Sequence, residues 1–312
     1  MTTNTTTDNK KEFNREASKL RNWVKVGSDQ FPPELDRYHL YANYTCPWVN
    51  RVLIVRKLKG LEHVISVSIT EPRLDEKEGW PFNPEFDELT TEDSINHAKN
   101  IPELYKLSDA NYQGRYSVPI LWDKKKSVIV NNESSEIIRM LNSEFNAFSN
   151  NPQLNLLPSD LESEIDKINE LIYENINNGV YKCGFAPTQE GYDIAFDKLF
   201  NTLELLEKRL DTNRYLLGDR FTEADVRLFP TLVRFDAAYY NGFKYKTAES
   251  AKRALESMTT EKKAIGGKVP ELAILEDFKA KAKNGGSRGG FRGDRGGRGG
   301  RGGFKSHKKQ RN

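Results

Sequence analysis

Cys46 is the residue of this 312-residue chain whose type and position best suit covalent chemistry. It follows a short β-prone run at residues 38–42 and precedes a stretch whose apolar residues recur at helical spacing. Thr45 is the expected N-cap of that helix, and Pro47 suits its first turn. Free backbone N–H groups and the helix dipole stabilise a thiolate there. We therefore expect a nucleophilic Cys46 with a depressed pKa; the alternative is a small buried thiol at a strand–helix junction.

Other reactive residue types give weaker signals. Cys183 lies beside Gly184 between two helical stripes, where a structural role is expected. The histidines are scattered singly at positions 39, 63, 97 and 307, so the sequence predicts no metal site. It contains no Ser-His-Asp elbow, no phosphate-binding loop and no dinucleotide fingerprint. Two cysteines exclude a disulfide framework and are typical of a reducing compartment such as the cytoplasm.

Two other sites along the chain would suit a peptide bound beside Cys46. Val118-Pro119 precedes a predicted strand, and a cis peptide bond, tolerated only before proline, would expose the Val118 backbone for pairing. Glu133-Ser134 opens a predicted helix whose first-turn N–H groups would bind a carboxylate; simple capping is the alternative. A cysteinyl peptide could span these two points with its thiol at Cys46.

The spacing of apolar residues predicts an α/β domain over residues 19–150. The asparagines at 131 and 132 are the expected caps of its last helix. The predicted order is strand, helix, strand, a long insertion with a short helix, two hairpin strands and a helix. These elements fall at residues 38–42, 47–59, 64–69, 102–106, 117–123, 127–130 and 133–145.

Residues 156–244 are predicted to form an all-helical second domain. Apolar stripes at helical spacing run through 161–176 and 194–210. A third helix begins at Thr222, where a Ser/Thr-x-x-acid pattern that ends at Asp225 predicts a capping box. No run in the chain approaches the roughly 18 apolar residues that span a bilayer, so an integral membrane protein is excluded.

The two ends differ in composition from the body of the chain. Residues 1–18 are rich in Thr, Asn, Lys and Glu, lack the apolar core of a secretory signal and are expected to be disordered. Residues 281–312 carry eleven Lys or Arg and one Asp, a charge of +10, so the total of +3 leaves −7 for residues 1–280. Glycine fills eleven of the nineteen positions at 285–303, which predicts a disordered tail.

Seven short segments form an ordered set of motifs across both predicted domains. They are residues 41–51 (YANYTCPWVNR), 79–80 (GW), 114–123 (GRYSVPILWD), 130–137 (VNNESSEI), 177–182 (NNGVYK), 188–190 (TQE) and 233–236 (VRFD). The set resembles the Xi-class glutathione transferases, the glutathionyl-hydroquinone reductases, over roughly residues 20–244. The resemblance implies a thioredoxin-like domain followed by a helical transferase domain, and a family-like homodimer.

The resemblance also implies roles for individual residues. Cys46 is the nucleophile: its thiolate attacks the sulfur of a glutathionyl-hydroquinone, the hydroquinone leaves, and a second glutathione resolves the mixed disulfide. Glutathione is thus a co-substrate, and no metal takes part. Tyr181 and Tyr239 fall where the family contacts the quinol; helix packing is the alternative. The residues that fall where the family binds glutathione are Trp80, Arg115, Val118, Glu133 and Ser134.

The chain departs from the family after about residue 244. Residues 245–280 resemble the second half of an RNA-recognition motif, with an ordinary amphipathic helix as the alternative for 248–258. In the tail, glycine-spaced arginines and two phenylalanines suit single-stranded RNA through phosphate contacts and stacking. A basic tail also adds the nucleus to the candidate compartments. The candidate RNA-binding residues are Arg288, Phe291, Arg292, Arg295, Arg298, Arg301 and Phe304.

Three functions therefore compete. The first is a glutathione-dependent transferase that reductively deglutathionylates glutathionyl-hydroquinones. The second is an RNA-binding or interaction protein that acts through the tail on an inactive transferase scaffold. The third is an omega-like thioltransferase or dehydroascorbate reductase, which would use the same Cys46 chemistry on other substrates.

Overall fold

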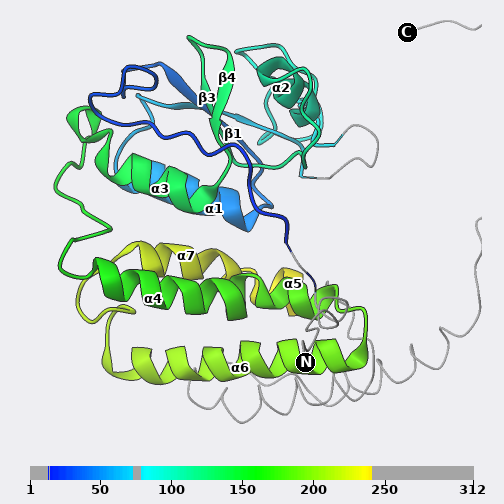
Figure 1. Cartoon of the computed structure of the whole chain (residues 1–312), viewed down its shortest axis with the longest axis vertical. Helices are drawn as coiled ribbons and strands as arrows, with labels where there is room; N and C mark the ends of the chain where they lie inside the picture. Colours follow the sequence, from blue (N-terminus) through cyan, green and yellow to red (C-terminus); the bar gives the residue numbers. More distant parts are fainter. Residues whose placement is uncertain (1–12, 14, 73–78, 241–312) are drawn as a thin grey trace, which may run out of the picture. The chain divides into compact units, whose positions relative to one another are not determined.

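The computed structural model describes residue 13 and residues 15–72 and 79–240 (Figure 1). These residues form an α/β domain followed by a helical domain, in the order that the sequence predicts. Both domains belong to one compact unit. The predicted segment at 245–280 and the predicted RNA-binding tail at 281–312 lie outside the described residues, so they stay predictions.

A four-stranded mixed sheet with the strand order β2-β1-β3-β4 organises the α/β domain. β1 is parallel to β2 and antiparallel to β3, and β3 is antiparallel to β4. This arrangement is the thioredoxin-like fold that the sequence motifs imply. Strands β1 to β4 are Tyr38–Ala42, Ser66–Ile69, Ile120–Asp123 and Val128–Asn131, and helices α1 to α3 are Pro47–Leu58, Ile101–Ser108 and Ser134–Ser143.

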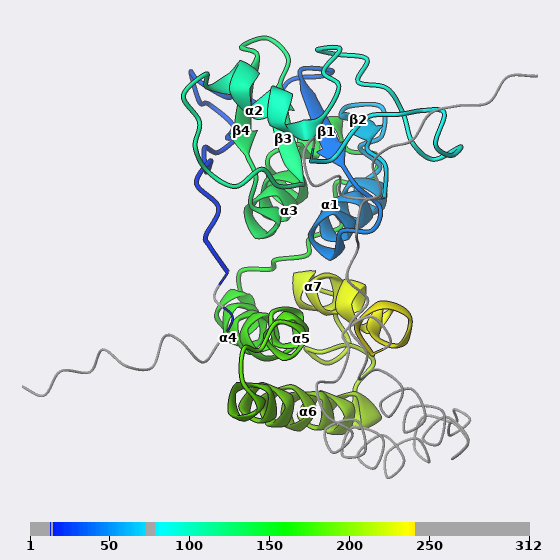
Figure 2. The same cartoon turned by 90° about the vertical axis from the view of Figure 1, so that its right-hand side faces the viewer.

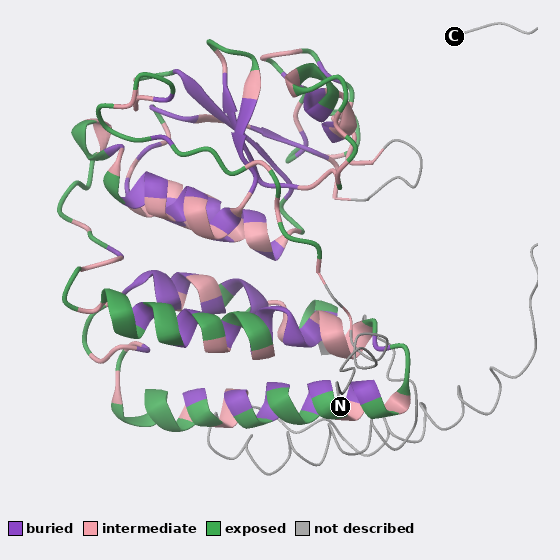
Figure 3. Cartoon of the chain, in the orientation of Figure 1, coloured by how far each residue is buried: buried purple, intermediate pink, exposed green. Residues whose placement is uncertain are grey.

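Helices cover both faces of the sheet. Because alternate residues of a strand point to opposite faces, Leu40 and Leu121 belong to the apolar cluster that contains α1 and α3, whereas Tyr41 and Trp122 belong to the cluster with α2. Figures 1 and 2 show α1 and α3 on one side of the sheet and α2 on the other, and Figure 3 shows largely buried strands. The packed sheet fixes the start of α1, and therefore Cys46, at the end of β1.

The structure corrects two predicted helix caps. Cys46, not Thr45, is the N-cap residue of α1, because Asn43 Oδ1 accepts hydrogen bonds from both the N–H and the hydroxyl of Thr45 at 2.9 and 2.5 Å. Glu133 is the N-cap of α3, in place of either asparagine before it. Its carboxylate accepts a hydrogen bond from the Ser135 N–H at 3.0 Å.

The helical domain confirms the predicted capping box and has helices over both predicted stripes, although Ile194 and Leu210 of the second stripe are exposed. Thr222 and Asp225 cap the last α-helix reciprocally. A short 3₁₀ turn, Asn146–Phe148, follows α3. Two π-helical turns follow α4 and α7 at Tyr173–Asn177 and Phe235–Tyr240. Helices α4 to α7 are Glu162–Ile172, Gly179–Gly184, Gln189–Thr212 and Glu223–Leu232.

A buried arginine joins α1 to the helical domain. Arg51 donates hydrogen bonds to Asn177 Oδ1 at 2.5 Å and to the Arg227 carbonyl at 3.2 Å, and its guanidinium lies 4.6 Å from the ring centroid of Trp48. Burial lowers the pKa of Arg51 to about 9. Trp48 in turn packs against Tyr173, with ring centroids 6.0 Å apart. These contacts bring the first turn of α1 beside the π-helical turn after α4.

The structure describes part of the N-terminal region, including residue 13 and residues 15–18 of the range 1–18 whose composition predicts disorder. Asn132 N–H donates to the Leu20 carbonyl, and Asn22 N–H donates to the Val130 carbonyl, both at 3.0 Å. The chain at residues 20–22 therefore runs beside the end of β4, and residues 15–19 continue from there toward the helical domain. We call residues 15–22 the N-terminal segment.

Candidate active site

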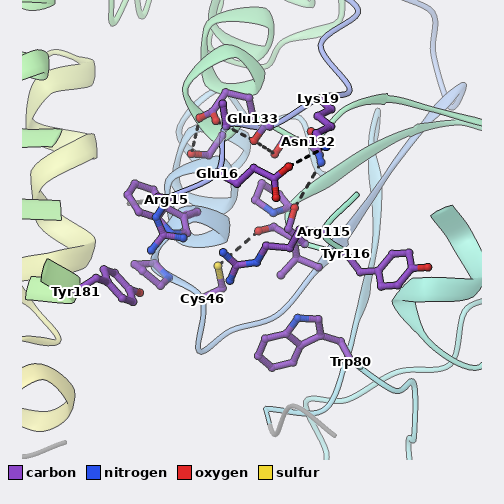
Figure 4. A pocket seen from close by; sticks show the side chains of 18 of the residues that line it. Arg15, Glu16, Lys19, Cys46, Trp80, Arg115, Tyr116, Asn132, Glu133 and Tyr181 are labelled. Carbon is purple, nitrogen blue, oxygen red and sulfur yellow. Dashed lines mark hydrogen bonds and ion pairs between the residues drawn. The ribbon is translucent and has the colours of Figure 1, made fainter. Parts of the chain in front are cut away.

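A cavity of about 420 Å³ lies over the start of α1 (Figure 4). Its walls come from the first turn of α1, the loop before β3, the start of α3, the N-terminal segment and helix α5. Tyr239 lies behind Tyr181, with their ring centroids 5.8 Å apart. The predicted nucleophile and six of the seven residues predicted to bind glutathione or quinol line this cavity, namely Cys46, Trp80, Arg115, Val118, Glu133, Ser134 and Tyr181.

The Cys46 thiol lies partly buried at the floor of the cavity, where it donates a hydrogen bond to the Val118 carbonyl at 3.6 Å. The predicted depression of its pKa is wrong for this structure, because burial raises the pKa of Cys46 above its usual value. The N–H groups of Val49 and Trp48 act in the opposite direction, as the helix position implies. The charges of two guanidinium groups, from Arg15 and Arg234, also favour the thiolate.

The Val118-Pro119 peptide bond is cis, as the sequence analysis anticipated. Val118 is buried, and its carbonyl faces the Cys46 sulfur. β3 begins directly after this dipeptide, at Ile120, and pairs with β1. The sheet therefore fixes the distance between the Val118 backbone and the thiol.

A buried tyrosine ties the loop before β3 to the start of α3. The Tyr105 hydroxyl of α2 donates to the Ser117 carbonyl at 2.9 Å and accepts hydrogen bonds from the Ser117 N–H at 3.2 Å and from Asn132 Nδ2 at 2.9 Å. Asn132 is 5% exposed, and its Oδ1 has no hydrogen-bond partner within the part of the chain that the structure describes. Tyr105 thus sets the spacing between Val118 and Glu133.

Glu133 and Ser134 form a polar corner of the cavity at the start of α3. The Glu133 carboxylate accepts hydrogen bonds from the N–H and the hydroxyl of Ser135 at 3.0 and 2.9 Å, and from the Ser18 hydroxyl at 3.1 Å. Ser134 is buried, with its hydroxyl 3.5 Å from the Glu133 carboxylate. The Glu133 carboxylate therefore already accepts a hydrogen bond from one of the first-turn N–H groups of α3, which were predicted to bind a ligand carboxylate. The corner offers an anion to a ligand cation and hydroxyl groups to a ligand carboxylate.

Trp80 and Arg115 line the cavity from the long insertion. Trp80 packs against the apolar cluster around α2, and its carbonyl accepts a hydrogen bond from the N–H of Ile101, the first residue of α2, at 2.9 Å. The Arg115 carbonyl accepts a hydrogen bond from the Tyr112 hydroxyl at 3.1 Å. The Arg115 side chain contributes a positive charge that acts on Glu16 of the N-terminal segment. This wall can thus offer an indole face and a guanidinium to a peptide.

The opposite part of the cavity is aromatic. Tyr181 of α5 packs against Phe185 as well as Tyr239, with the Phe185 centroid 6.3 Å away. Burial raises the pKa of both Tyr181 and Tyr239. Together with Trp48 of α1, these rings form an apolar surface that suits a flat aromatic group.

Arg15 and Trp48 also line the cavity, although neither was predicted from the sequence as a site residue. The Arg15 guanidinium lies 5.1 Å from the ring centroid of Trp48 and 4.6 Å from that of Tyr181. Arg15 was missed because a Thr-, Asn- and Lys-rich composition gave no periodic signal for residues 1–18. Trp48 had a signal: it lies two residues after Cys46, in the first turn of the helix that carries the thiol.

Neither a metal site nor a membrane span is found among the described residues. No group of three or more His, Cys, Asp or Glu side chains there could hold a metal ion. Within the same residues, no helix is long and apolar enough to cross a bilayer. The described chemistry of the cavity is therefore that of a thiol, a carboxylate, guanidinium groups and aromatic rings.

Comparison with known proteins places both domains in the glutathione transferases. The family described as the N-terminal domain of glutathione S-transferase matches residues 45–144, and the family described as the C-terminal domain matches residues 189–256. The glutathione S-transferase Xi from Phanerochaete chrysosporium is 45% identical in its crystal structure, with a TM-score of 0.72 over 82% of this chain and 86% of that one.

Curated relatives define the family further. Glutathionyl-hydroquinone reductase PcpF from Sphingobium chlorophenolicum is 51% identical over 74% of this chain and 72% of the relative. Glutathionyl-hydroquinone reductase YqjG from Escherichia coli K-12 is 47% identical over 75% of this chain and 72% of the relative, and a glutathione-bound structure of YqjG has a TM-score of 0.69. The chain belongs to the Xi-class glutathione transferases, the family of the glutathionyl-hydroquinone reductases.

Proposed function

We propose that this chain reduces glutathionyl-hydroquinones with glutathione as the reductant. The observation that carries the proposal is the position of Cys46, which lines one cavity together with the polar groups of the α/β domain and the aromatic rings of α1 and α5. A glutathionyl-hydroquinone has the same two parts, a tripeptide and an aromatic ring, joined through sulfur. Membership of the family, with two relatives named as reductases of this kind, supports the same substrate class.

In the proposed complex, the peptide part lies along the Val118 backbone with its γ-glutamyl group at the start of α3. The Glu133 carboxylate binds the α-ammonium group, and the Ser134 hydroxyl binds the adjacent carboxylate. Trp80 and Arg115 contact the rest of the peptide, for which the cavity offers an indole face and a positive charge. The aromatic ring then falls against Tyr181, with Tyr239 supporting the tyrosine from behind.

The first half-reaction transfers the glutathionyl group to the enzyme. The Cys46 thiolate attacks the glutathione sulfur, so an S–S bond forms while the C–S bond to the ring breaks. The bonding electron pair stays with the ring carbon, which takes up a proton to give the free hydroquinone. The ring carbon is thus reduced and the Cys46 sulfur is oxidised.

The second half-reaction restores the thiolate. A second glutathione, as its thiolate, attacks the mixed disulfide and releases glutathione disulfide. One enzyme cysteine is sufficient for this cycle. A supply of reduced glutathione is required, which fits the cytoplasmic compartment expected from the cysteine content.

The test is turnover of glutathionyl-menadiol by the full chain in the presence of glutathione. We expect one menadiol and one glutathione disulfide for each conjugate consumed. Hydroxyethyl disulfide and dehydroascorbate, assayed in parallel, test the omega-like alternative. The hydroquinone reductase function is refuted if the enzyme turns over hydroxyethyl disulfide or dehydroascorbate but does not turn over the menadiol conjugate.

We further propose that the tail binds single-stranded RNA with little sequence preference. The supporting observation is the +10 charge of residues 281–312, with arginines and phenylalanines spaced by glycines. RNA titration of the full chain and of a 1–284 truncation at two salt concentrations tests it. We expect affinity only with the tail and a steep loss as salt rises; equal affinities would refute the proposal.

A further inference from the structure

Arg15 occupies the boundary between the two parts of the cavity. Its guanidinium lies between the Trp48 ring of α1 and the Tyr181 ring of α5, at 5.1 and 4.6 Å from their centroids, and Nε donates to Asn178 Oδ1 at 3.0 Å. No carboxylate of the described residues forms an ion pair with it. Figure 4 shows Arg15 beside Tyr181 on the same side of the cavity as the Cys46 sulfur. Arg15 is thus a half-buried cation whose charge is available to a ligand.

Hydrogen bonds on both sides hold the N-terminal segment across the cavity. On the α/β domain, the Ser18 hydroxyl donates to Glu133 and to the Asn132 carbonyl, at 3.1 and 3.3 Å. On the helical domain, Arg15 itself reaches Asn178, between the π-helical turn and α5. The ranges matched by the two family descriptions, 45–144 and 189–256, do not include this segment.

We propose that Arg15 is a catalytic residue whose guanidinium contacts the quinol ring and stabilises the negative charge that passes from Cys46 to that ring. The inference rests on the proposed function, because it concerns the same half-reaction. At the start the charge is on the Cys46 sulfur, and after C–S cleavage it is on the ring carbon. A cation fixed between these two positions stabilises the transition state, in which the charge is spread over both.

The chemistry of arginine suits this position better than that of lysine. A guanidinium is planar, remains charged when half-buried and stacks on aromatic faces, so it can stay between Trp48 and Tyr181 and still cover a quinol ring. Its charge also opposes the effect of burial on the Cys46 thiol, whose pKa Arg15 lowers. Arg234 acts on the thiol in the same direction, but the Tyr44 carbonyl holds its Nη2 at 2.9 Å, outside the aromatic wall.

The experiment compares Arg15→Ala and Arg15→Lys with Lys25→Ala, all in a Cys183→Ala background of the full chain. Lys25 is exposed, lies outside the cavity and controls for the loss of one positive charge near the N-terminus. Two quantities are measured: the pH dependence of Cys46 alkylation by iodoacetamide, and kcat and KM with glutathionyl-menadiol and glutathione. Melting temperatures verify that each variant folds.

For Arg15→Ala we expect a rise of about 0.5–1 unit in the alkylation midpoint and a 30- to 100-fold loss of kcat/KM for the conjugate, with the KM for glutathione changed less than about twofold. Arg15→Lys keeps the positive charge but loses the stacking on the rings. We therefore expect an unchanged alkylation midpoint and about a tenfold loss of kcat/KM for the conjugate. Lys25→Ala should match the background in both quantities.

Two results would overturn the role of Arg15. One is an Arg15→Ala activity within threefold of the control. The other is a loss of activity with an unchanged alkylation midpoint and a proportional rise in the KM for glutathione, which indicates a structural role. If the background enzyme does not turn over the conjugate at all, the proposed function fails. In that case only the alkylation midpoint tests Arg15. A higher midpoint in Arg15→Ala than in the background enzyme supports the electrostatic role of Arg15, and an unchanged midpoint overturns it.

Discussion

The two walls of the cavity are built in different ways. The wall proposed for glutathione is mostly backbone and polar groups of the α/β domain that hydrogen bonds through Tyr105 and Glu133 connect, and Trp80 and Arg115 complete it from the long insertion. The wall proposed for the quinol consists of large rings and one guanidinium, contributed by α1, α5 and the N-terminal segment. A connected polar wall suits the peptide part, which is the same in every conjugate, whereas stacked rings accept aromatic groups of different shapes.

The difference also separates what each wall contributes to the reaction. The polar wall binds the same groups before and after C–S cleavage, so changes there should act mainly on KM. The aromatic wall with Arg15 lies where charge develops, so changes there should act mainly on kcat. The predictions below test this division.

The largest effect is expected at the sulfur that joins the two walls. Cys46→Ala should lower deglutathionylation by more than about a thousandfold, because the second thiol of the chain, Cys183, does not line the cavity. Cys183→Ala should retain most activity, since burial raises the pKa of Cys183 to about 12 and keeps it protonated. An inactive Cys183→Ala variant with an active Cys46→Ala variant would reverse the assignment.

The pH dependence of alkylation tests the protonation state of the same sulfur. Because burial raises the pKa of Cys46 above its usual value, the free enzyme holds mostly thiol at pH 7. The alkylation rate should therefore increase about tenfold per pH unit between pH 7 and 8. If the alkylation rate has already reached its plateau at pH 7, the helix N–H groups and the two arginines lower the pKa of Cys46 by more than burial raises it.

Removing the charge of the polar wall should weaken binding without slowing the chemistry. Glu133→Gln keeps an oxygen that can cap α3 but loses the ion pair with the ligand ammonium group. We expect the KM for the conjugate to rise about 10- to 30-fold, with kcat within about threefold. Glu144→Gln, at the opposite end of α3, is the matched control. An equal rise in both variants would remove Glu133 from the binding site.

A smaller effect is expected from the tyrosine that connects the polar wall. Tyr105→Phe removes the hydroxyl between Ser117 and Asn132, and we expect a three- to tenfold rise in KM and a loss of about 1 kcal/mol of stability. Tyr38→Phe is a matched control, because Tyr38 is also buried and its hydroxyl also donates to a backbone carbonyl, that of Pro32, at 2.8 Å. If both variants lose the same stability but only Tyr105→Phe changes KM, Tyr105 positions the binding site. If KM is unchanged in both variants, that positioning role is contradicted.

The sequence predicted the polar wall better than the aromatic one. Cys46, Val118 and Glu133 follow or begin regular elements, so spacing rules locate them. Arg15 lies in a segment without periodicity, and only three-dimensional packing places it beside Tyr181. The pKa of Cys46 depends on burial, which the sequence does not reveal, so the helix N-terminus alone predicted the wrong direction. Thr45 does not cap α1 as predicted, since its hydroxyl donates a hydrogen bond to Asn43 Oδ1.

The central claim is that Cys46 accepts the glutathionyl group and the quinol leaves without becoming attached to the enzyme. The most direct measurement is mass spectrometry of the full chain after one equivalent of glutathionyl-menadiol, with no free glutathione. We expect a gain of one glutathionyl group on the tryptic peptide 38–51, which contains Cys46, and one equivalent of released menadiol. An adduct on Cys183, an adduct that carries the quinone ring, or menadiol release without any adduct on Cys46 would contradict it.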